Sequence, residues 1–173
     1  MKKAIAFLVF LTATTYMAFA SDLYCGVSAM GQGALNDTAH AVVAQADIAA
    51  KMSLGGFLDY RNGLYGDASF AYRIADKQYS RFTDVPSYEQ FALGFGWIYK
   101  GDVLLMSIDA GLAMARIGKS WEAGVYLDVH PRFLAAEFDA VGRIAVGLPF
   151  QFVFTGMTYR HSIGLSVGWE IYR

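Results

Sequence analysis

The sequence has few of the residues that hold small disulfide-rich domains together or bind nucleic acids. Its one cysteine, Cys25, excludes an intrachain disulfide and a cysteine-based zinc cluster. Lysine is scarce after residue 20, with only Lys51, Lys77, Lys100 and Lys119, and the formal net charge is −1. A chain so close to neutral offers no basic surface, so nucleic acid is excluded as a partner.

Long apolar runs are also missing beyond the N-terminal segment. Hydrophobic residues make up 55% of the chain and its mean hydropathy is +0.33, which is high for an exported soluble protein. After residue 20, however, no stretch has the roughly 17 uncharged apolar residues that a transmembrane helix needs. The apolar residues must follow another pattern. No Pro-rich or Ser-rich linker divides residues 21–173, so they are expected to form one domain.

Residues 1–20 have the pattern of a secretory signal peptide. Lys2 and Lys3 form a positive start, residues 4–19 are uncharged and largely apolar, and Ala18-Phe19-Ala20 is a small-x-small cleavage site. An uncleaved membrane anchor is the alternative, because the apolar run is almost long enough to cross a bilayer. The cleavage site favours export across the inner membrane and a mature chain that starts at Ser21.

The rest of the chain alternates with a period of two, which is the β-strand pattern. It is clearest at the C-terminus, where large apolar residues at 163, 165, 167, 169 and 171 alternate with Ser, Gly and Glu. The same rule places strands near 23–33, 51–60, 64–74, 90–99, 104–114, 121–129, 137–146 and 162–171. The sequence therefore predicts about eight strands.

The residues that alternate with the large apolar ones form a second row along each strand. Their composition indicates which face of the strand meets lipid and which faces the interior. A soluble β-sandwich or lipocalin-like barrel would present Lys, Thr, Glu and Gln outward, whereas this row is mostly Gly, Ala and Ser with isolated charges. The interior of an eight-stranded barrel is only just wide enough for side chains, so small residues fit there. The large apolar row then faces lipid, and a closed barrel satisfies every backbone group. We predict an all-β fold, a closed antiparallel eight-stranded up-and-down transmembrane β-barrel over residues 21–173.

Loop lengths and aromatic residues suggest its orientation. Tight turns are expected at 61–63, 100–102 and 130–132 on the periplasmic side. Longer segments at 34–50, 75–87 and 148–159, with a short one at 116–120, are expected outside. An interface girdle is predicted from Tyr60, Trp97, Tyr99 and Trp169 on the periplasmic side and Tyr72 and Trp121 on the outer side.

With these features the chain resembles the small outer-membrane β-barrel families: the OmpA barrel domain, the OmpX and Ail group, and the OmpW group. The most specific part is the alternating last strand from Ile163 to Ile171, which in these families is read by the barrel-insertion machinery. The chain departs from them by placing Arg173 last and Tyr172 on the opposite face. The resemblance implies a bacterial outer-membrane location, with outer-membrane lipid and the insertion machinery as partners.

The predicted inward row carries more acids than bases. We expect ion pairs within it, with Arg61, Arg116, Arg132 or Arg160 reaching in from the rims, because charges away from water need partners. The network would plug the lumen, and a narrow cation-favouring path is the alternative. The predicted interior charges are Asp59, Asp67, Arg73, Asp109, Glu122, Asp128, Glu137, Asp139, Arg143 and Glu170.

We expect a structural or surface-interaction role through the external loops, with a surface ligand as a possible partner. The alternative is OmpW-like passage of small hydrophobic molecules. In that case Ala39 to Ala50 would form a lid, with a short helix capped by Asn36-Asp37-Thr38; equally, it would simply extend the first two strands. Phe150, Phe152 and Phe154 would line an entrance, bind a surface partner or pack together.

Lipid A modification is the minor alternative. In lipid A deacylases His and Ser lie two residues apart on one strand, whereas His161 and Ser162 are adjacent and must point to opposite faces. We therefore expect no enzyme and assign no catalytic residue, cofactor or metal. His40 and His130 are placed in loops or turns, and Cys25 on the lipid-facing surface.

Overall fold

The computed structural model describes residues 22–38, 41–73, 88–117, 119–138, 142–156 and 158–172. The predicted signal peptide, residues 1–20, lies outside them, so its cleavage stays a prediction. Within these ranges, no helix has the length and apolar character needed to cross a membrane.

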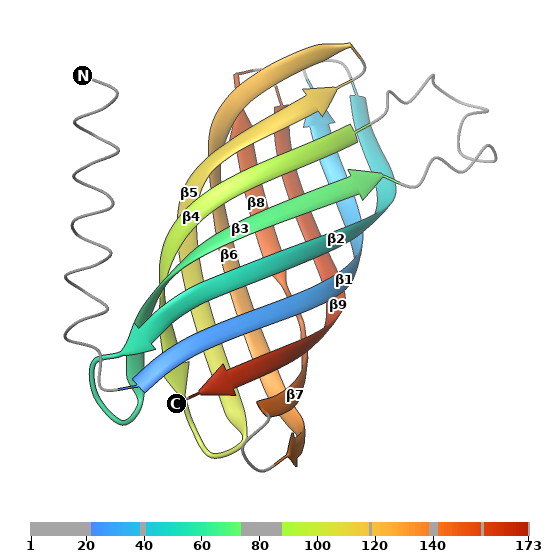
Figure 1. Ribbon diagram of the computed structural model, residues 1–173. Coiled ribbons are helices and arrows are strands. Elements are labelled where there is room, and N and C mark those ends of the chain that lie inside the picture. The colour runs from blue at the N-terminus through green and yellow to red at the C-terminus, as the bar shows by residue number, and fades with distance from the viewer. Residues whose placement is uncertain are drawn as a thin grey trace, which may run out of the picture.

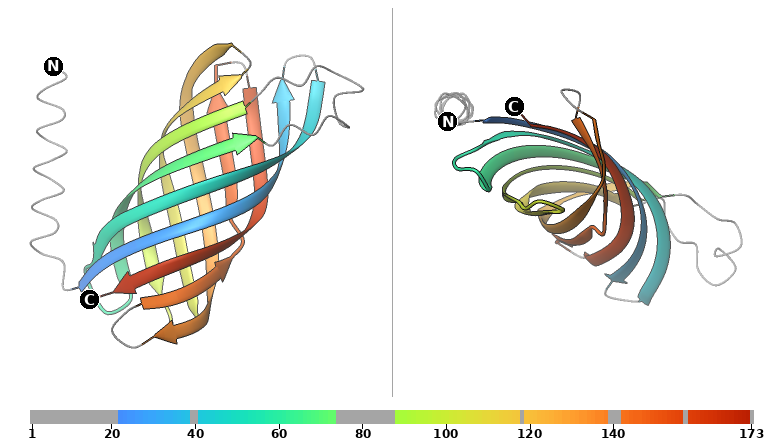
Figure 2. Two further views of the ribbon diagram at one scale, coloured as in Figure 1. Left: turned by 45° about the vertical axis from the view of Figure 1, so that its right-hand side comes forward. Right: turned by 90° about the horizontal axis from the view of Figure 1, so that it is seen from below.

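The described residues form nine antiparallel strands in a single sheet. These are β1 (Asp22–Thr38), β2 (Ala41–Phe57), β3 (Asn62–Arg73), β4 (Tyr88–Lys100), β5 (Leu104–Ile117), β6 (Ser120–Phe138), β7 (Gly142–Gly147), β8 (Phe150–Thr155) and β9 (Thr158–Tyr172). Each of β1 to β6 pairs with the next strand in the sequence, which is an up-and-down arrangement. The sheet wraps around one axis with strongly tilted strands (Figures 1 and 2).

The sheet closes on itself because β1 pairs with β9 along its length, from Tyr24 opposite Tyr172 to Thr38 opposite Thr158. The wall has eight positions, since β7 and β8 share one of them. β8 pairs with one half of β6 and β7 with the other, and both pair with β9. The predicted closed eight-stranded antiparallel barrel is therefore confirmed.

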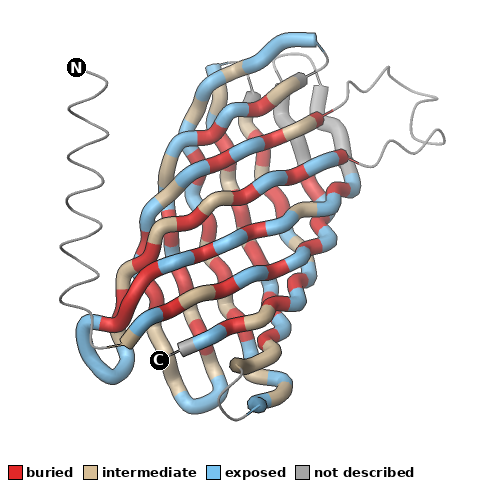
Figure 3. Tube along the Cα trace, viewed as in Figure 1, coloured by how far each residue is buried: buried red, intermediate tan, exposed pale blue. Residues whose placement is uncertain are grey.

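Burial follows the predicted period of two, and the barrel is apolar outside and polar inside. Leu93, Leu165 and Val167 expose more than half of their surface, at 52%, 66% and 58%. The buried side is rich in Ser, Gln, Asp, Glu, Lys and Arg. In Figure 3 buried and exposed residues alternate along the strands, as expected for two faces of one wall. The predicted assignment of the large apolar row to the lipid side agrees with this burial.

The predicted turn at 130–132 is wrong, because β6 runs through these residues to Phe138. Pro131 lies opposite Met106 of β5, and its carbonyl accepts a hydrogen bond of 2.9 Å from the amide of Leu148. A β-bulge between Leu134 and Ala136 follows. Pro131 itself lies opposite the break between β7 and β8, and strands tolerate proline at such irregularities. The connection to β7 falls in residues 139–141, outside the described ranges.

Two predicted external segments are also largely strand. Pairing of β1 with β2 continues to Thr38 opposite Ala41, so a helical lid over Ala39 to Ala50 is excluded for its described part, and the alternative of extended strands holds. In the predicted segment 148–159, Phe150–Thr155 is β8. The strand at this wall position is interrupted only at Leu148 and Pro149. Both stay joined to the neighbouring strands, because the Leu148 amide donates to Pro131 of β6 and the Pro149 carbonyl accepts from Gly164 of β9.

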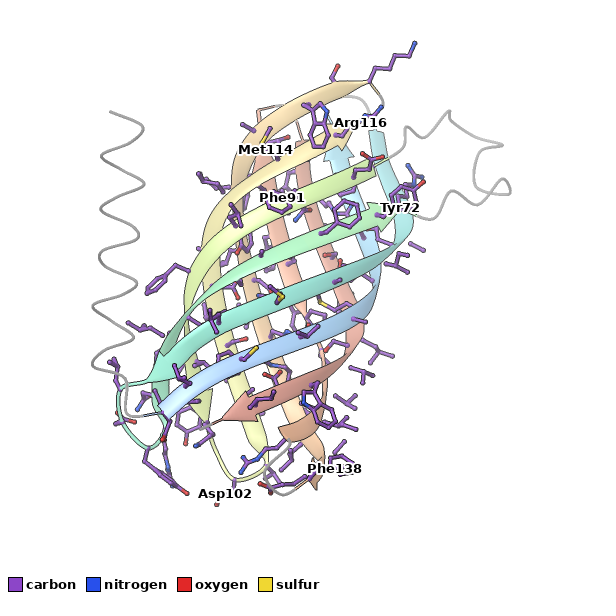
Figure 4. All side chains as sticks on the ribbon, viewed as in Figure 1. Tyr72, Phe91, Asp102, Met114, Arg116 and Phe138 are labelled. Carbon is purple, nitrogen blue, oxygen red and sulfur yellow. The ribbon has the colours of Figure 1, made fainter. Side chains whose placement is uncertain are left out.

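The predicted girdle residues lie on the outer surface near the two ends. Tyr60, Tyr72 and Trp121 are exposed, while Tyr99 and Trp169 are half-buried. Trp97 lies 6.1 Å from Tyr99, measured between ring centroids, and Trp169 stacks on Phe138 at 5.7 Å. In Figure 4 Tyr72 lies toward the end opposite Asp102 and Phe138. Phe138 is a ring that the predicted girdle omitted.

Candidate functional site

The centre of the lumen holds one lysine among three aspartates. The ammonium of Lys51 on β2 lies 2.6 Å from Asp109, 2.7 Å from Asp128 and 3.5 Å from Asp67. All four side chains are at most 5% exposed. The carboxylates come from β3, β5 and β6, so Lys51 spans the lumen and ties four strands together.

Two tyrosines complete this lysine cluster. Tyr65 donates a hydrogen bond of 2.5 Å to Asp109, and Tyr126 donates to both oxygens of Asp67, at 2.9 and 3.0 Å. Gly94 makes room for the second tyrosine, because a Cβ at that position would lie 1.8 Å from the Tyr126 hydroxyl. Small residues on the inward faces of the strands thus leave room for the large polar side chains.

A second polar group lies toward the end where β1 starts and β9 finishes, which is the predicted periplasmic end. Arg132 of β6 pairs with Glu170 of β9 and donates hydrogen bonds of 3.1 Å to Tyr24 and to Ser107. His130 lies 2.6 Å from the Ser166 hydroxyl. Since every one of these side chains is buried, the group closes the β6 to β9 side of the lumen.

An apolar cluster closes the other side of the same end. It consists of Tyr24, Phe57, Tyr65, Ile98 and Leu105, all on inward faces of β1 to β5 and all at most 6% exposed. The Tyr24 ring packs edge-on against Phe57 at 6.2 Å and Tyr65 at 6.0 Å. This apolar stopper lies directly below the lysine cluster, because Tyr65 belongs to both.

The outer half of the lumen is polar and contains a buried ion pair. Arg160 of β9 pairs with Asp47 of β2, and its guanidinium lies over the Tyr88 ring at 3.9 Å from the ring centroid. The Tyr88 hydroxyl donates to Gln90 at 2.5 Å, and the Gln90 amide donates to Gln151 at 3.2 Å. Buried polar side chains from β2, β4, β8 and β9 therefore meet in this half of the barrel.

The structure brings together only part of the predicted interior charges. Asp67, Asp109, Asp128, Arg73 and Glu170 are buried inside the barrel. Glu122 is half-buried near the outer end, where it accepts a hydrogen bond of 2.5 Å from Thr155.

The remaining predicted charges lie elsewhere. Asp59 is exposed in the turn between β2 and β3, since the strand ends at Phe57 before its alternation reaches it. Glu137 is exposed and pairs with Arg143 at 2.7 Å at the end where β1 starts, because β6 runs on past the predicted turn to Phe138. Asp139 lies outside the described residues.

Lys51 and Asp47 were missed, although the sequence contains the signal for both. Met52 and Leu54 are large apolar residues two positions apart, and a period of two that turns them toward lipid puts residues 47, 49, 51 and 53 inside. Arg132 and Arg160 were expected to reach in from the rims. They instead belong to strands β6 and β9, with their side chains fully inside the wall.

His161 and Ser162, the two residues considered above for lipid A chemistry, do not face each other. His161 lies on the outer face and Ser162 is buried inside, as their adjacency predicts. His130 and Ser166 are in contact but only 1% and 2% exposed, so a substrate has no access to them. Among the described residues, no three His, Cys, Asp or Glu side chains converge in a way that would hold a metal ion.

No protein-family model and no curated protein sequence matches the chain. Solved structures do match it. Ail, the attachment invasion locus protein of Yersinia pestis, has a TM-score of 0.60 and 6% identity, covering 86% of this chain and 98% of that one. The same protein in complex with the heparin analogue sucrose octasulfate has a TM-score of 0.62 at 7% identity, covering 86% and 99%.

Two further structures show the same likeness. Neisserial surface protein A has a TM-score of 0.58 and 13% identity, covering 86% of this chain and 96% of that one. The N-terminal β-barrel domain of Pseudomonas aeruginosa OprF has a TM-score of 0.53 and 15% identity, covering 84% and 97%. At these identities the likeness shows the fold. The chain has the fold of the small β-barrels of the bacterial outer membrane, which agrees with the predicted fold and location.

Proposed function

We propose that this protein is a non-conducting, non-enzymatic outer-membrane barrel that carries rigid hairpins to the cell surface for a structural or surface-interaction role. The observation that carries the proposal is the filled lumen. Lys51 with its three aspartates crosses the centre, and the stopper of Tyr24, Phe57, Tyr65, Ile98 and Leu105 lies beneath it.

An ion or solute that crosses the barrel would have to displace both of these groups of side chains. Passage would require Lys51 to leave two short contacts in a low-dielectric interior, and separated buried charges are costly. It would also require water to enter the apolar stopper, whose side chains lose contact energy when they move apart. An open path is therefore expected to be rare in the native barrel.

The external end supports the surface role. Strand pairing continues to Ile117 opposite Ser120 in β5 and β6, and to Phe154 opposite Tyr159 in β8 and β9. Pairing that continues to the strand ends holds the described residues beside each turn in fixed positions, which reduces the entropy lost on binding. One protein with this fold, Ail, has been crystallised with a heparin analogue, which makes a sulfated polysaccharide a reasonable first probe.

Planar-bilayer conductance tests the closed lumen. The wild-type barrel should give only rare openings, whereas Lys51→Ala combined with Phe57→Ala should conduct steadily because both barriers are removed. Lys119→Ala is the matched control, since Lys119 is exposed near the outer end. Frequent, stable channels in the wild type would refute the proposal, provided that all variants show the heat-dependent gel shift of a folded barrel.

Adhesion tests the surface role. Cells that display the barrel should bind to immobilised heparin, and Arg116→Ser with Lys119→Ser should weaken this binding, because both cations lie near the outer end. Arg61→Ser, in a turn at the opposite end, is the control. Binding that is absent from the wild type, or that Arg61→Ser reduces equally, would count against this polysaccharide as the surface ligand.

Passage of small hydrophobic molecules is the alternative, and lipid A modification the minor one. The filled lumen and the strand structure of β2 argue against passage, and the separation of His161 from Ser162 argues against lipid A chemistry. Saturable uptake of an apolar solute by proteoliposomes would support the first alternative. A changed lipid A mass on expression would support the second.

A further inference from the structure

The lipid-facing wall contains a hollow of about 680 Å³ that lies over β7, β9, β1, β2 and β3. Its lining is almost entirely apolar and includes Ala29, Gly31, Ala50, Phe70 and Leu165. These strands are neighbours in the wall, so the hollow crosses five of them without a break. We call it the wall groove.

The groove follows from the sizes of side chains in adjacent cross-strand rows. One row runs Val146, Val167, Ala29, Ala50, Phe70, because each is the register partner of the next. The parallel row runs Leu165, Gly31, Ile48, Tyr72. Ala29 and Ala50 in the first row and Gly31 in the second are small, while the larger side chains beside them stand out from the wall. Leu165 is 66% exposed and Ile48 is 52% exposed.

An empty apolar hollow of this size is unfavourable, because its lining loses dispersion contacts on one side. The face around it is the lipid-facing surface of the barrel, and the groove is continuous with that surface. Since its walls carry no charge, a polar or charged ligand would lose its hydration without gaining a partner. The chemistry of the groove therefore fits a hydrocarbon chain.

The length of the groove indicates how long the hydrocarbon chain is, and its position indicates from which side of the membrane the chain enters. Four strand spacings of about 4.8 Å give a length of roughly 19 Å. At about 1.2 Å per bond of an extended chain, this corresponds to roughly 16 bonds. The β3 end of the groove lies nearer the outside, because Tyr72 is next to the end of β3 at Arg73 (Figure 4). We propose that the wall groove is a binding site for one acyl chain of an outer-leaflet lipid, which enters beside Tyr72 and ends near Val146.

The test counts the lipid chains that the barrel immobilises. The full chain is reconstituted in dimyristoyl phosphatidylcholine vesicles with a phosphatidylcholine that carries a nitroxide near the end of one chain. Electron paramagnetic resonance then gives the number of motionally restricted chains per barrel. Replacing Ala29 and Ala50 by leucine fills the groove, so the count should fall by about one chain per barrel as that chain loses its contacts.

The control variant is Ala110→Leu with Ala123→Leu, on β5 and β6. Both alanines are exposed on the lipid-facing surface but lie away from the groove. The control should keep the wild-type count. No fall in the filled variant, or an equal fall in the control, would overturn the proposal. So would sedimentation in detergent that shows a dimeric wild type and a monomeric filled variant, because a second copy would then cover the groove.

Discussion

Lys51 on β2 and Asp109 on β5 meet inside the barrel, with the ammonium 2.6 Å from the carboxylate. Their strands are separated in the wall by β3 and β4, so this contact crosses the lumen and does not follow the sheet. It therefore links opposite sides of the barrel wall.

The first prediction concerns the loss of this cation. Lys51→Met leaves Asp67, Asp109 and Asp128 buried without their shared partner, and breaking a buried pair in this way costs about 3 to 5 kcal/mol. The free energy of unfolding in urea, measured in lipid vesicles, should fall by that amount. Adding Asp109→Asn and Asp128→Asn should recover much of the loss. Equal stability of Lys51→Met and the wild type would show that the cluster does not hold the barrel together.

The second prediction concerns the space above Gly94. Gly94→Ala places a methyl group on the Tyr126 hydroxyl and close to Asp67, so the hydrogen bond between those two side chains must move. Overpacking of this kind costs about 1 to 3 kcal/mol. Gly66→Ala on β3 is the control, because its Cβ would meet only the Gly94 carbonyl, at an ordinary 3.7 Å. Unfolding in urea should separate the two variants, and similar values would contradict this role for Gly94.

The third prediction concerns the turn between β2 and β3. Asp59 accepts hydrogen bonds from the amides of Arg61, at 2.7 Å, and Asn62, at 2.6 Å, and these bonds to the charged form hold the pKa of Asp59 below its ordinary value. The stabilisation is therefore present above the pKa of the unfolded chain and is lost as pH falls through the lower folded value. The stability difference between wild type and Asp59→Ala should shrink below about pH 4. A difference that stays constant with pH would exclude the carboxylate as its source.

The barrel fold and the assignment of its lipid-facing and inward faces could be predicted because both follow from the alternation. In β4, for example, Phe91, Leu93 and Phe95 are exposed while Gln90 and Ala92 are buried, as a period of two requires. The narrow lumen explains why the inward row is rich in small residues.

Strand ends were harder to predict, because they depend on pairing across the wall. His130-Pro131-Arg132 looks like a turn, since proline lacks an amide hydrogen. In the barrel Pro131 stays within β6, where its carbonyl is used by Leu148. The Ala-rich start of β2 has little contrast between its faces, so its alternation was too weak to show a strand.

The composition of the lumen could be predicted only in part. The acids Asp67, Asp109 and Asp128 stand out in rows of small residues, but which base neutralises them depends on distances across the barrel. The stopper was not predicted because each of its residues, such as Phe57 and Ile98, lies near a strand end. Near a strand end, a single large side chain that points inward leaves the alternation of the rest of the strand unchanged, so it gives no separate signal.

Quenching of tryptophan fluorescence by brominated lipid tests the central claim that the large apolar side chains face acyl chains. The chain has three tryptophans, and Trp97, Trp121 and Trp169 all lie on the outer face. In vesicles of phosphatidylcholine brominated near the headgroup end of the chain, their emission should be strongly quenched relative to unbrominated vesicles. Unquenched emission from a protein that remains in the supernatant as a water-soluble monomer would contradict the account.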